Sequence, residues 1–165
     1  MKDLNLIKEY AIKSHGDCNC VYDGKPYSLH LELVYNVALK FIHLIPEDKR
    51  EVVLAGCWVH DLIEDARQTY NDVKKVCGLE VAELAYALTN EKGKTRKERA
   101  NDKYYEGIRN TPYATFIKLC DRIANYDYSC AKGSSMGKKY KEEMPDFVSK
   151  LYDEKYQEMF DYLNS

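Results

Sequence analysis

Apolar residues recur every three or four positions along most of this 165-residue chain, which is the spacing of one face of an α-helix. No segment shows the sustained alternation of apolar and polar residues that is typical of a half-buried strand. The pattern therefore predicts an all-α fold. Because no linker or internal repeat interrupts the pattern, we expect one compact helical bundle over residues 1–165.

The first half of the chain divides into helices at glycine and proline. Breakers between Gly16 and Pro26 end a first helix that carries Leu4, Ile7 and Ala11. The later helices are expected from near Ser28 to about Ile45, from Pro46 past Asp65, and, as shorter pieces, over residues 70–76 and 80–88.

The second half begins with the polar stretch TNEKGKTRKE, which predicts a mobile loop around Gly93. Helices are expected over residues 98–109, 113–126 and 146–163. The last of these has Phe147, Leu151, Met159 and Leu163 on one face. The segment 129–144 contains Gly133, Ser134, Ser135 and Gly137, so it is interpreted as a surface connection.

Composition and charge restrict the function classes. The net charge of −2 excludes a strong bulk attraction to nucleic acid or to an anionic membrane. The longest apolar run, residues 52–59, is far shorter than the ~20 residues of a membrane helix. The N-terminus lacks the continuous apolar stretch of a secretion signal, so we expect cytoplasmic residence.

The six cysteines are interpreted as reduced thiols, because Cys57 and Cys120 lie within apolar helical patterns and no export signal is present. Cys18 and Cys20 form a C-x-C pair of the kind that binds a soft metal. No second Cys/His pair follows at zinc-finger spacing, so a structural role is favoured for them.

Four residues are candidates for a metal site. His30 shares a helical face with Val34 and Val37, where a lone histidine is more often a hydrogen-bonded core residue than a ligand. His60 and Asp61 end an apolar run, and Glu64 and Asp65 follow one turn later. A solvated helix end would explain the carboxylates, but not a histidine and an aspartate beside Val59.

Asp121 lies on the inner side of its helix, and an isolated buried carboxylate costs several kcal/mol unless a cation or a proton compensates it. A divalent metal shared with His30, His60 and Asp61 would compensate it. Two imidazoles and two carboxylates suit manganese, iron or zinc, and also cobalt or nickel.

His30, the His60-Asp61 pair and Asp121 resemble the metal-binding pattern of the HD superfamily. The motifs GKPYSLH, HDLIEDA and KLCDRIAN are more narrowly similar to the hydrolase domain of the RelA/SpoT family and to the small alarmone hydrolases. The resemblance spans about residues 23–126. It implies an HD-domain bundle, manganese as cofactor, and removal of pyrophosphate from the 3′ position of guanosine tetra- and pentaphosphate.

The same resemblance implies further roles. Glu64 and Asp65 match the family's catalytic Glu-Asp pair, and a nearby carboxylate is suited to position or deprotonate a water for attack on phosphorus. Asn125 matches a family asparagine that orients a ligand or the ribose, with hydrogen bonding in the core as an equal alternative. Lys25 and Tyr27 lie in the first motif and are expected to contact substrate.

A basic stretch, Lys92, Lys94, Arg96, Lys97 and Arg99, matches the position of a basic stretch in the family, and Arg99 is the best single match. A solvated helix face explains the stretch equally well, because acidic residues interleave with it. Val21 and Tyr22 stand where the family has basic residues that help to hold the nucleotide. This departure questions guanine preference and leaves Tyr22 or Tyr27 available to stack on a base.

The sequence therefore predicts an enzyme that hydrolyses a phosphorylated nucleotide. Alternatives are an HD-type nucleotidase or phosphodiesterase acting on another nucleotide, and a regulatory module that binds a nucleotide without cleaving it. A chain of 165 residues has no room for a second, synthetase domain. No nucleic-acid or membrane partner is expected, and homo-oligomerisation is left open.

Overall fold

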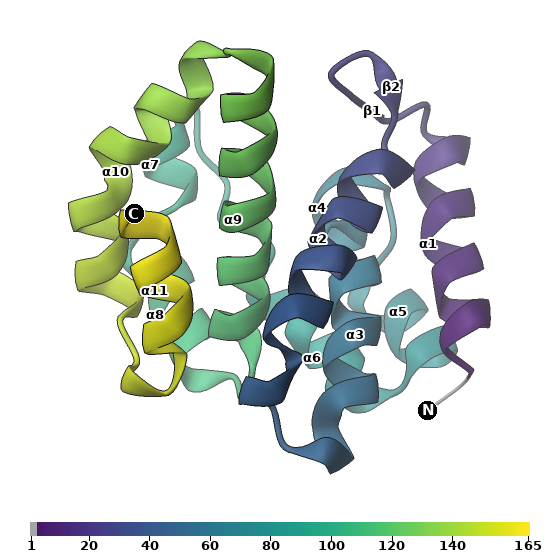
Figure 1. The fold of residues 1–165 in the computed structure, drawn as a ribbon. Helices are drawn as coiled ribbons and strands as arrows, with labels where there is room; N and C mark the ends of the chain where they lie inside the picture. The colour runs from purple at the N-terminus through teal and green to yellow at the C-terminus, as the bar shows by residue number, and fades with distance from the viewer. Residues whose placement is uncertain (1–2) are drawn as a thin grey trace.

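Two long helices, α2 (Ser28–Phe41) and α9 (Ala114–Lys132), pack side by side at the centre of the computed structural model, which describes residues 3–165 (Figure 1). On one side, α3 (Arg50–Val59) packs on α2 and α1 (Leu4–Asp17) packs on α3. On the other side, α10 (Ser135–Leu151) and α11 (Gln157–Asn164) pack on α9. The predicted all-α fold is confirmed.

Short elements connect these long helices. A pair of helices, α5 (Tyr70–Cys77) and α6 (Leu79–Ala87), packs together, and α6 also contacts α3. The remaining helical elements are η1 (Ile42–Leu44), η2 (Glu47–Lys49), α4 (Leu62–Asp65), α7 (Arg96–Arg99), α8 (Asp102–Asn110) and η3 (Glu154–Tyr156).

The segment before α2, expected as a loop, contains a small antiparallel hairpin of β1 (Val21–Tyr22) and β2 (Lys25–Pro26). Its turn residues, Asp23 and Gly24, have φ values of 52° and 74°. An Asp-Gly pair with two positive φ angles suits a two-residue hairpin, because this turn follows the twist of the strands. The turn signal that ends the first helix therefore also folds this hairpin.

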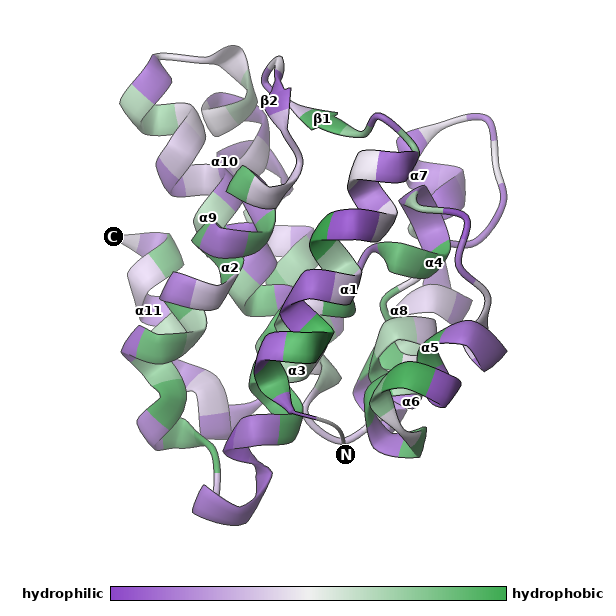
Figure 2. Cartoon of the chain, turned by 90° about the vertical axis from the view of Figure 1, so that its right-hand side faces the viewer, coloured by the Kyte–Doolittle hydropathy of each residue, from purple (hydrophilic) through white to green (hydrophobic). Residues whose placement is uncertain are grey.

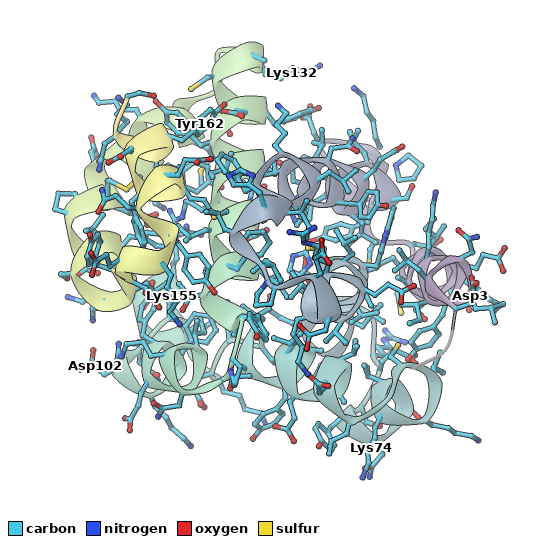
Figure 3. The ribbon with its side chains drawn as sticks, turned by 60° about the horizontal axis from the view of Figure 1, so that its bottom comes forward. Asp3, Lys74, Asp102, Lys132, Lys155 and Tyr162 are labelled. Atoms are coloured by element: carbon cyan, nitrogen blue, oxygen red, sulfur yellow. The ribbon has the colours of Figure 1, made fainter. Side chains whose placement is uncertain are left out.

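The apolar faces of the helices meet in two clusters. One cluster lies between α2, α9, α10 and α11, and the other lies between α1, α3, α5 and α6. Figure 2 shows hydrophobic and hydrophilic residues alternating along these helices, as amphipathic helices require. Charged residues such as Asp3, Lys74 and Asp102 lie at the periphery (Figure 3). Each fully buried leucine, isoleucine or phenylalanine contributes about 1.5–3 kcal/mol.

Gly56 permits the close approach of three helices beneath the site described below. A Cβ at this position of α3 would lie 2.6 Å from Ile117 Cδ1 on α9 and 3.1 Å from Leu84 Cδ1 on α6. Only a residue without a side chain fits there without moving its neighbours. The contact holds α3 against α9, and these two helices lead to His60 and Asp121.

Four helix predictions need correction. Residues 129–144, expected as a surface connection, form the end of α9 and most of α10. The helix expected over residues 146–163 is interrupted after Leu151 and resumes as α11. The glycine and serine residues do interrupt the helix, but the interruption is only two residues long. Gly133 ends α9 in a left-handed conformation, and the side chain of Ser134 caps α10 one residue later.

The other two corrections concern places where one continuous helix was expected and two separate helices are found. The helix from Pro46 ends at Val59, and α4 starts after His60 and Asp61. The helix expected over residues 98–109 is divided into α7 and α8, because Asn101 caps α8 through its side chain.

No helix among residues 3–165 is long and apolar enough to cross a membrane. The cytoplasmic location and the single-domain organisation expected from the sequence stay predictions.

Candidate metal centre

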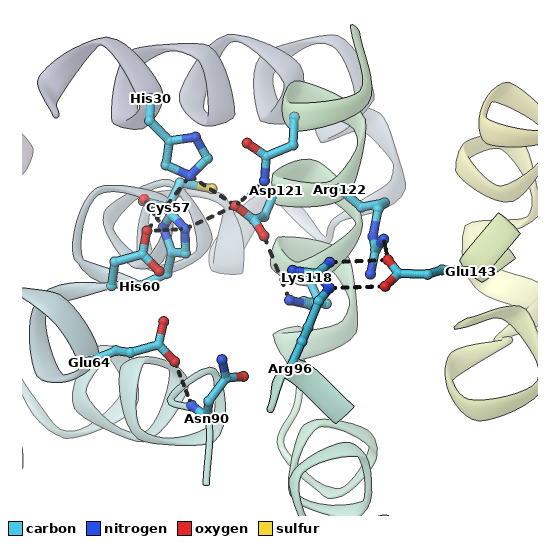
Figure 4. A network of polar contacts seen from close by, with 12 residues as sticks. His30, Cys57, His60, Glu64, Asn90, Arg96, Lys118, Asp121, Arg122 and Glu143 are labelled. Atoms are coloured by element: carbon cyan, nitrogen blue, oxygen red, sulfur yellow. Dashed lines mark hydrogen bonds and ion pairs between the residues drawn. The ribbon is translucent and has the colours of Figure 1, made fainter. Parts of the chain in front are cut away.

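Four side chains that are far apart in sequence converge beside the contact between α2, α3 and α9 (Figure 4). Nε2 of His30 lies 2.9 Å from Oδ1 of Asp121, and Nε2 of His60 lies 3.0 Å from Oδ2 of Asp61. The other two nitrogen–oxygen distances are 3.7 Å between His30 and Asp61 and 3.4 Å between His60 and Asp121. The four residues that the sequence predicted as ligands therefore lie together.

The local backbone explains this convergence. His30 is the third residue of α2 and is buried on the same face as Val34 and Val37. Asp121 projects from the middle of α9. His60 and Asp61 are adjacent, and side chains of adjacent residues on a continuous helix point about 100° apart. The helix is interrupted here, with Asp61 at φ −105° and ψ 0°, so both side chains reach the same point.

His60 has the hydrogen-bond arrangement of a metal-binding histidine. Its Nδ1 lies 2.7 Å from the carbonyl oxygen of Cys57, and because a carbonyl only accepts, Nδ1 donates the proton. In the neutral ring Nε2 then carries a lone pair. This buried atom has no hydrogen-bond partner among residues 3–165, although a carboxylate oxygen lies 3.0 Å away. Two acceptors at this distance repel unless a cation or a proton lies between them, so the residues present fit a bound metal ion.

The titration behaviour of the cluster leads to the same conclusion. Burial lowers the pKa of His60, but the charges of Asp61 and Asp121 outweigh burial and raise it well above its ordinary value. Burial raises the pKa of Asp61, but His60 outweighs it and lowers the pKa to about 2. The pKa of Asp121 is lowered well below its ordinary value, against the effect of burial, by His30, His60 and Lys118. The site thus favours positive charge between its carboxylates.

Aromatic rings hold the outer side of the cluster. Tyr22 of the hairpin stacks on His30, with ring centroids 4.8 Å apart. The hydroxyl group of Tyr27 donates a hydrogen bond of 2.5 Å to Oδ2 of Asp61, and His15 stacks on Tyr27 at 4.4 Å. Burial, together with the charge of Asp61, raises the pKa of Tyr27 far above its ordinary value, so the hydroxyl group stays a donor. These contacts orient two of the four candidate ligands.

Glu64 and Asp65 lie on the one-turn helix α4, at the open side of the cluster. One carboxylate oxygen each of Asp61, Glu64 and Asp65 lies within 4.8 Å of the others. Glu64 Oε1 accepts a hydrogen bond of 2.8 Å from the backbone N–H of Asn90 (Figure 4). Burial and the charges of Asp61 and Glu64 raise the pKa of Asp65 to about 7. Burial likewise raises the pKa of Glu64.

A polar cavity of about 270 Å³ is lined by three of the candidate metal ligands and by both carboxylates of α4: His30, Asp61, Asp121, Glu64 and Asp65. A larger cavity of about 490 Å³ adjoins it, and four residues line both: Asn90, Arg96, Lys118 and Arg122. Lys118 Nζ lies 3.7 Å from Oδ2 of Asp121. Three cations therefore stand at the boundary between the candidate metal centre and a space of ligand size.

The predicted substrate contacts divide into two groups. Tyr27 and Asn125 line the cavity of the metal cluster. Arg99 lines the cavity of about 490 Å³ and also another, of about 610 Å³, beside Glu64 and Asp65, whereas Lys25 is exposed on the hairpin. Their roles stay predictions.

Three cationic residues at the cavity were missed in the sequence interpretation: Arg96 as an individual candidate, Lys118 and Arg122. A signal was present for the last two, because Lys118 and Arg122 lie three residues before and one residue after Asp121 in the KLCDRIAN motif. A lysine at i−3 on a helix is placed to meet an aspartate side chain. Arg96 stood within the basic stretch, but nothing in the sequence separated it from Arg99.

No family model matches the chain. A guanosine-3′,5′-bis(diphosphate) 3′-pyrophosphohydrolase of Aquifex aeolicus is 31% identical over 127 residues, which are 75% of this chain and 17% of that protein. The protein of the same activity named MESH1 in Drosophila melanogaster is 31% identical over 75 residues, 46% of this chain and 42% of the relative. Human MESH1 is 30% identical over 74 residues, 45% of this chain and 41% of the relative. The matches thus span less than half the length of these curated relatives.

One solved structure is described as a metazoan ortholog of SpoT that hydrolyses ppGpp and plays a role in starvation responses. It superposes with a TM-score of 0.71 over 97% of this chain and 92% of its own, at 20% identity. The resemblance to HD-type hydrolases is confirmed. The chain shares the fold of that structure, and its histidine and aspartate cluster lies where the motifs predicted it. That cluster is consistent with the metal site of HD hydrolases.

Proposed function

We propose that this HD domain is a metal-dependent phosphohydrolase that acts on a phosphorylated nucleotide, with guanosine 3′,5′-bis(diphosphate) as the first candidate and its 3′-pyrophosphate as the group removed. The observation that carries the proposal is one cavity lined by candidate metal ligands, by two further carboxylates and by cationic side chains. Ligands, acid–base groups and phosphate partners are what hydrolysis of a phosphate ester requires.

In this proposal His30, His60, Asp61 and Asp121 hold one divalent cation. Manganese is the first candidate, and iron, zinc, cobalt and nickel suit the same donor atoms. Such a cation, when bound, polarises a phosphoryl oxygen and lowers the pKa of water. Tyr27 keeps Asp61 oriented, and the Cys57 carbonyl keeps the Nε2 lone pair of His60 directed toward the centre.

Glu64 and Asp65 are proposed to position a water molecule and to accept its proton. Both carboxylates face the same cavity as the candidate ligands, and the bond from Asn90 fixes the orientation of Glu64. A proton acceptor works best when its pKa lies near the working pH, and the pKa of Asp65, raised to about 7, supports this role. Lys118 and Arg96 would neutralise the phosphate oxygens at the boundary of the cavity.

The nucleoside is proposed to lie toward the hairpin, beside Tyr22 and Asn125. Tyr22 is an aromatic residue where alarmone hydrolases have basic ones, which supports a second candidate substrate: a deoxynucleotide or a 2′- or 3′-phosphorylated cofactor, stacked on tyrosine. Cytoplasmic action on a small molecule, without a nucleic-acid partner, belongs to the same proposal.

The test is turnover of a nucleotide panel by the purified chain reconstituted with manganese. The panel contains guanosine 3′,5′-bis(diphosphate), deoxynucleoside triphosphates, phosphorylated cofactors and a cyclic phosphodiester. We expect release of pyrophosphate or phosphate from at least one member and none from the Asp121→Ala variant. Absence of release from the whole panel by protein that contains metal would favour a nucleotide-binding regulatory module.

A further inference from the structure

Glu143 of α10 is bound by two arginines at the boundary of the candidate active site (Figure 4). Its carboxylate accepts hydrogen bonds from Arg96 Nε at 2.9 Å and Arg96 Nη2 at 3.1 Å, a bidentate pair. Arg122 Nη1 donates a third bond at 2.8 Å. A carboxylate that receives three charge-assisted bonds is well satisfied as an anion.

The two arginines differ in freedom. The Arg122 side chain is 7% exposed and its guanidinium lies over Phe147 and Tyr140, at 4.4 and 5.0 Å from the ring centroids. The Arg96 side chain is 45% exposed and comes from the one-turn helix α7. Arg122 is therefore fixed in the core. Arg96, whose guanidinium lies 5.8 Å from the Tyr140 ring centroid, is more exposed and can turn toward a ligand once it leaves Glu143.

Both arginines line both cavities, whereas Glu143 lines only the larger one. The guanidinium groups of Arg96 and Arg122 therefore lie between the candidate metal centre and the carboxylate of Glu143. Burial raises the pKa of Glu143, but the two arginines outweigh it and lower the pKa to about 2, so the carboxylate is ionised at neutral pH. The arginines therefore already have an anion as partner when no ligand is bound.

We propose that Glu143 is a specificity-determining residue, an internal anion that a terminal phosphate or pyrophosphate group of the substrate must displace from Arg96. This inference deepens the proposed function and rests on it for the identity of the substrate as a nucleotide. Arg122 keeps Glu143 in place during the exchange, so α10 stays docked while Arg96 moves.

The exchange selects for charge. A carboxylate and a phosphodiester each carry one negative charge, so a diester that replaces Glu143 gains little from Arg96. A terminal phosphate or a pyrophosphate carries nearly two charges or more at neutral pH and has more acceptor oxygens. The site would therefore favour a substrate that has one phosphate group at the candidate metal centre and a second, terminal one at Arg96, and it would reject cyclic or internal phosphodiesters.

The test measures binding of inorganic pyrophosphate by calorimetry to protein stripped of metal and then dialysed, so that no bound cation contributes. The Glu143→Gln variant keeps the size of the side chain but removes its charge. We expect it to bind pyrophosphate about tenfold more tightly than the unmodified protein, the scale of one charge-assisted contact. Adding Arg96→Gln to this variant should abolish the gain. Dimethyl phosphate, a monoanionic diester, should bind neither form.

Asp146→Asn is the matched control. Asp146 also lines the larger cavity. Within the described residues, 3–165, it forms no ion pair with Arg96 or Arg122. This variant should change pyrophosphate affinity by less than about twofold, because it removes the same charge without freeing a guanidinium. Equal gains from Glu143→Gln and Asp146→Asn, or weaker binding by Glu143→Gln, would overturn the proposal.

If Glu143→Gln does not fold, the unmodified protein supplies the test. Pyrophosphate should shift the Nε–H NMR signal of Arg96, assigned with Arg96→Lys, and should leave that of Arg122 nearly unchanged. A reversed pattern, or no shift of either signal, would contradict the exchange. Because neither experiment uses metal or turnover, the proposed hydrolysis can fail while this inference stands, and the reverse also holds.

Discussion

The hydroxyl group of Tyr22 donates a hydrogen bond of 2.7 Å to Oδ1 of Asn125, and these residues are 103 positions apart in the sequence. Asn125 Nδ2 in turn lies 3.4 Å from Oδ1 of Asp121. The hairpin is thereby joined to α9 and, through one amide group, to a candidate metal ligand. The asparagine that the family resemblance assigns to ligand orientation is here held by a tyrosine.

Replacing Tyr22 with phenylalanine keeps the ring that stacks on His30 and removes only the hydroxyl group. We expect the free energy of unfolding to fall by about 1 kcal/mol, measured by urea denaturation of metal-free protein, because the half-buried amide of Asn125 loses its donor. The control is Tyr128→Phe, which removes an exposed hydrogen bond to Asp23 and should cost less. Equal decreases in the free energy of unfolding would show that the bond to Asn125 stabilises the fold no more than the exposed bond to Asp23 does.

Asp121→Ala should reduce both metal content and stability. The change removes one oxygen ligand and leaves Asp61 and the two histidines with one carboxylate fewer to share a cation. Elemental analysis after manganese reconstitution should find about one metal per unmodified chain and little in the variant. A chelator should lower the melting temperature of the unmodified protein. An unchanged melting temperature and unchanged activity after chelation would contradict the assignment of these ligands.

Glu64→Gln separates proton transfer from metal binding. Glutamine keeps the reach and the Asn90 contact of Glu64 but is not a base, so metal content should persist while turnover falls by roughly 10²-fold or more. Asp65→Asn should act similarly, and the double variant should cost little more than the worse single one. Glu91→Gln, at the rim of a neighbouring cavity, is the control. An empty metal site in Glu64→Gln would make Glu64 a ligand instead.

His15 should make stability depend on pH. Its ring is buried, neither nitrogen has a hydrogen-bond partner in the described part of the chain, and burial lowers its pKa to about 4. Because the unfolded chain binds a proton at this ring near pH 6.5, keeping the ring neutral carries no proton-linked cost above that pH. Stability is lost as the pH falls from about 6.5 to about 4. His15→Phe keeps a ring against Tyr27 and should remove this part of the dependence. Parallel stability curves for the two proteins between pH 7 and 4.5 would contradict it.

The site was more predictable from the sequence than its surroundings were. His30, the His60-Asp61 pair and Asp121 were identified because an ionisable residue on an apolar helical face needs a partner, and each lies in a motif on a predicted helix. The role of Glu143 could not be predicted in the same way. Its neighbours in KKYKEEM form an ordinary amphipathic pattern, and only the three-dimensional contact of α10 with α9 shows that two arginines surround it.

The misplaced boundary between α9 and α10 has one physical cause. Glycine and serine were interpreted as marking a connection of many residues, although a helix end and the next helix start need only one residue each. Gly133 and Ser134 complete both tasks, and Gly137 lies inside α10, where a Cβ would come within 3.4 Å of Cys130 Sγ. Which glycine ends a helix and which permits close packing depends on neighbours that are distant in sequence.

The interruption between α3 and α4 lets two groups of side chains be oriented independently, whereas a continuous helix would fix them relative to each other. His60 and Asp61 take their directions from the end of α3, which Gly56 locks against α9. Glu64 and Asp65 take theirs from a single turn, and Glu64 is also bonded to the backbone of the loop at Asn90. Substitutions in that loop are expected to redirect Glu64 and Asp65 while the candidate metal ligands keep their places. Under the proposed function, the molecule that is cleaved could therefore change while the candidate metal centre stays the same.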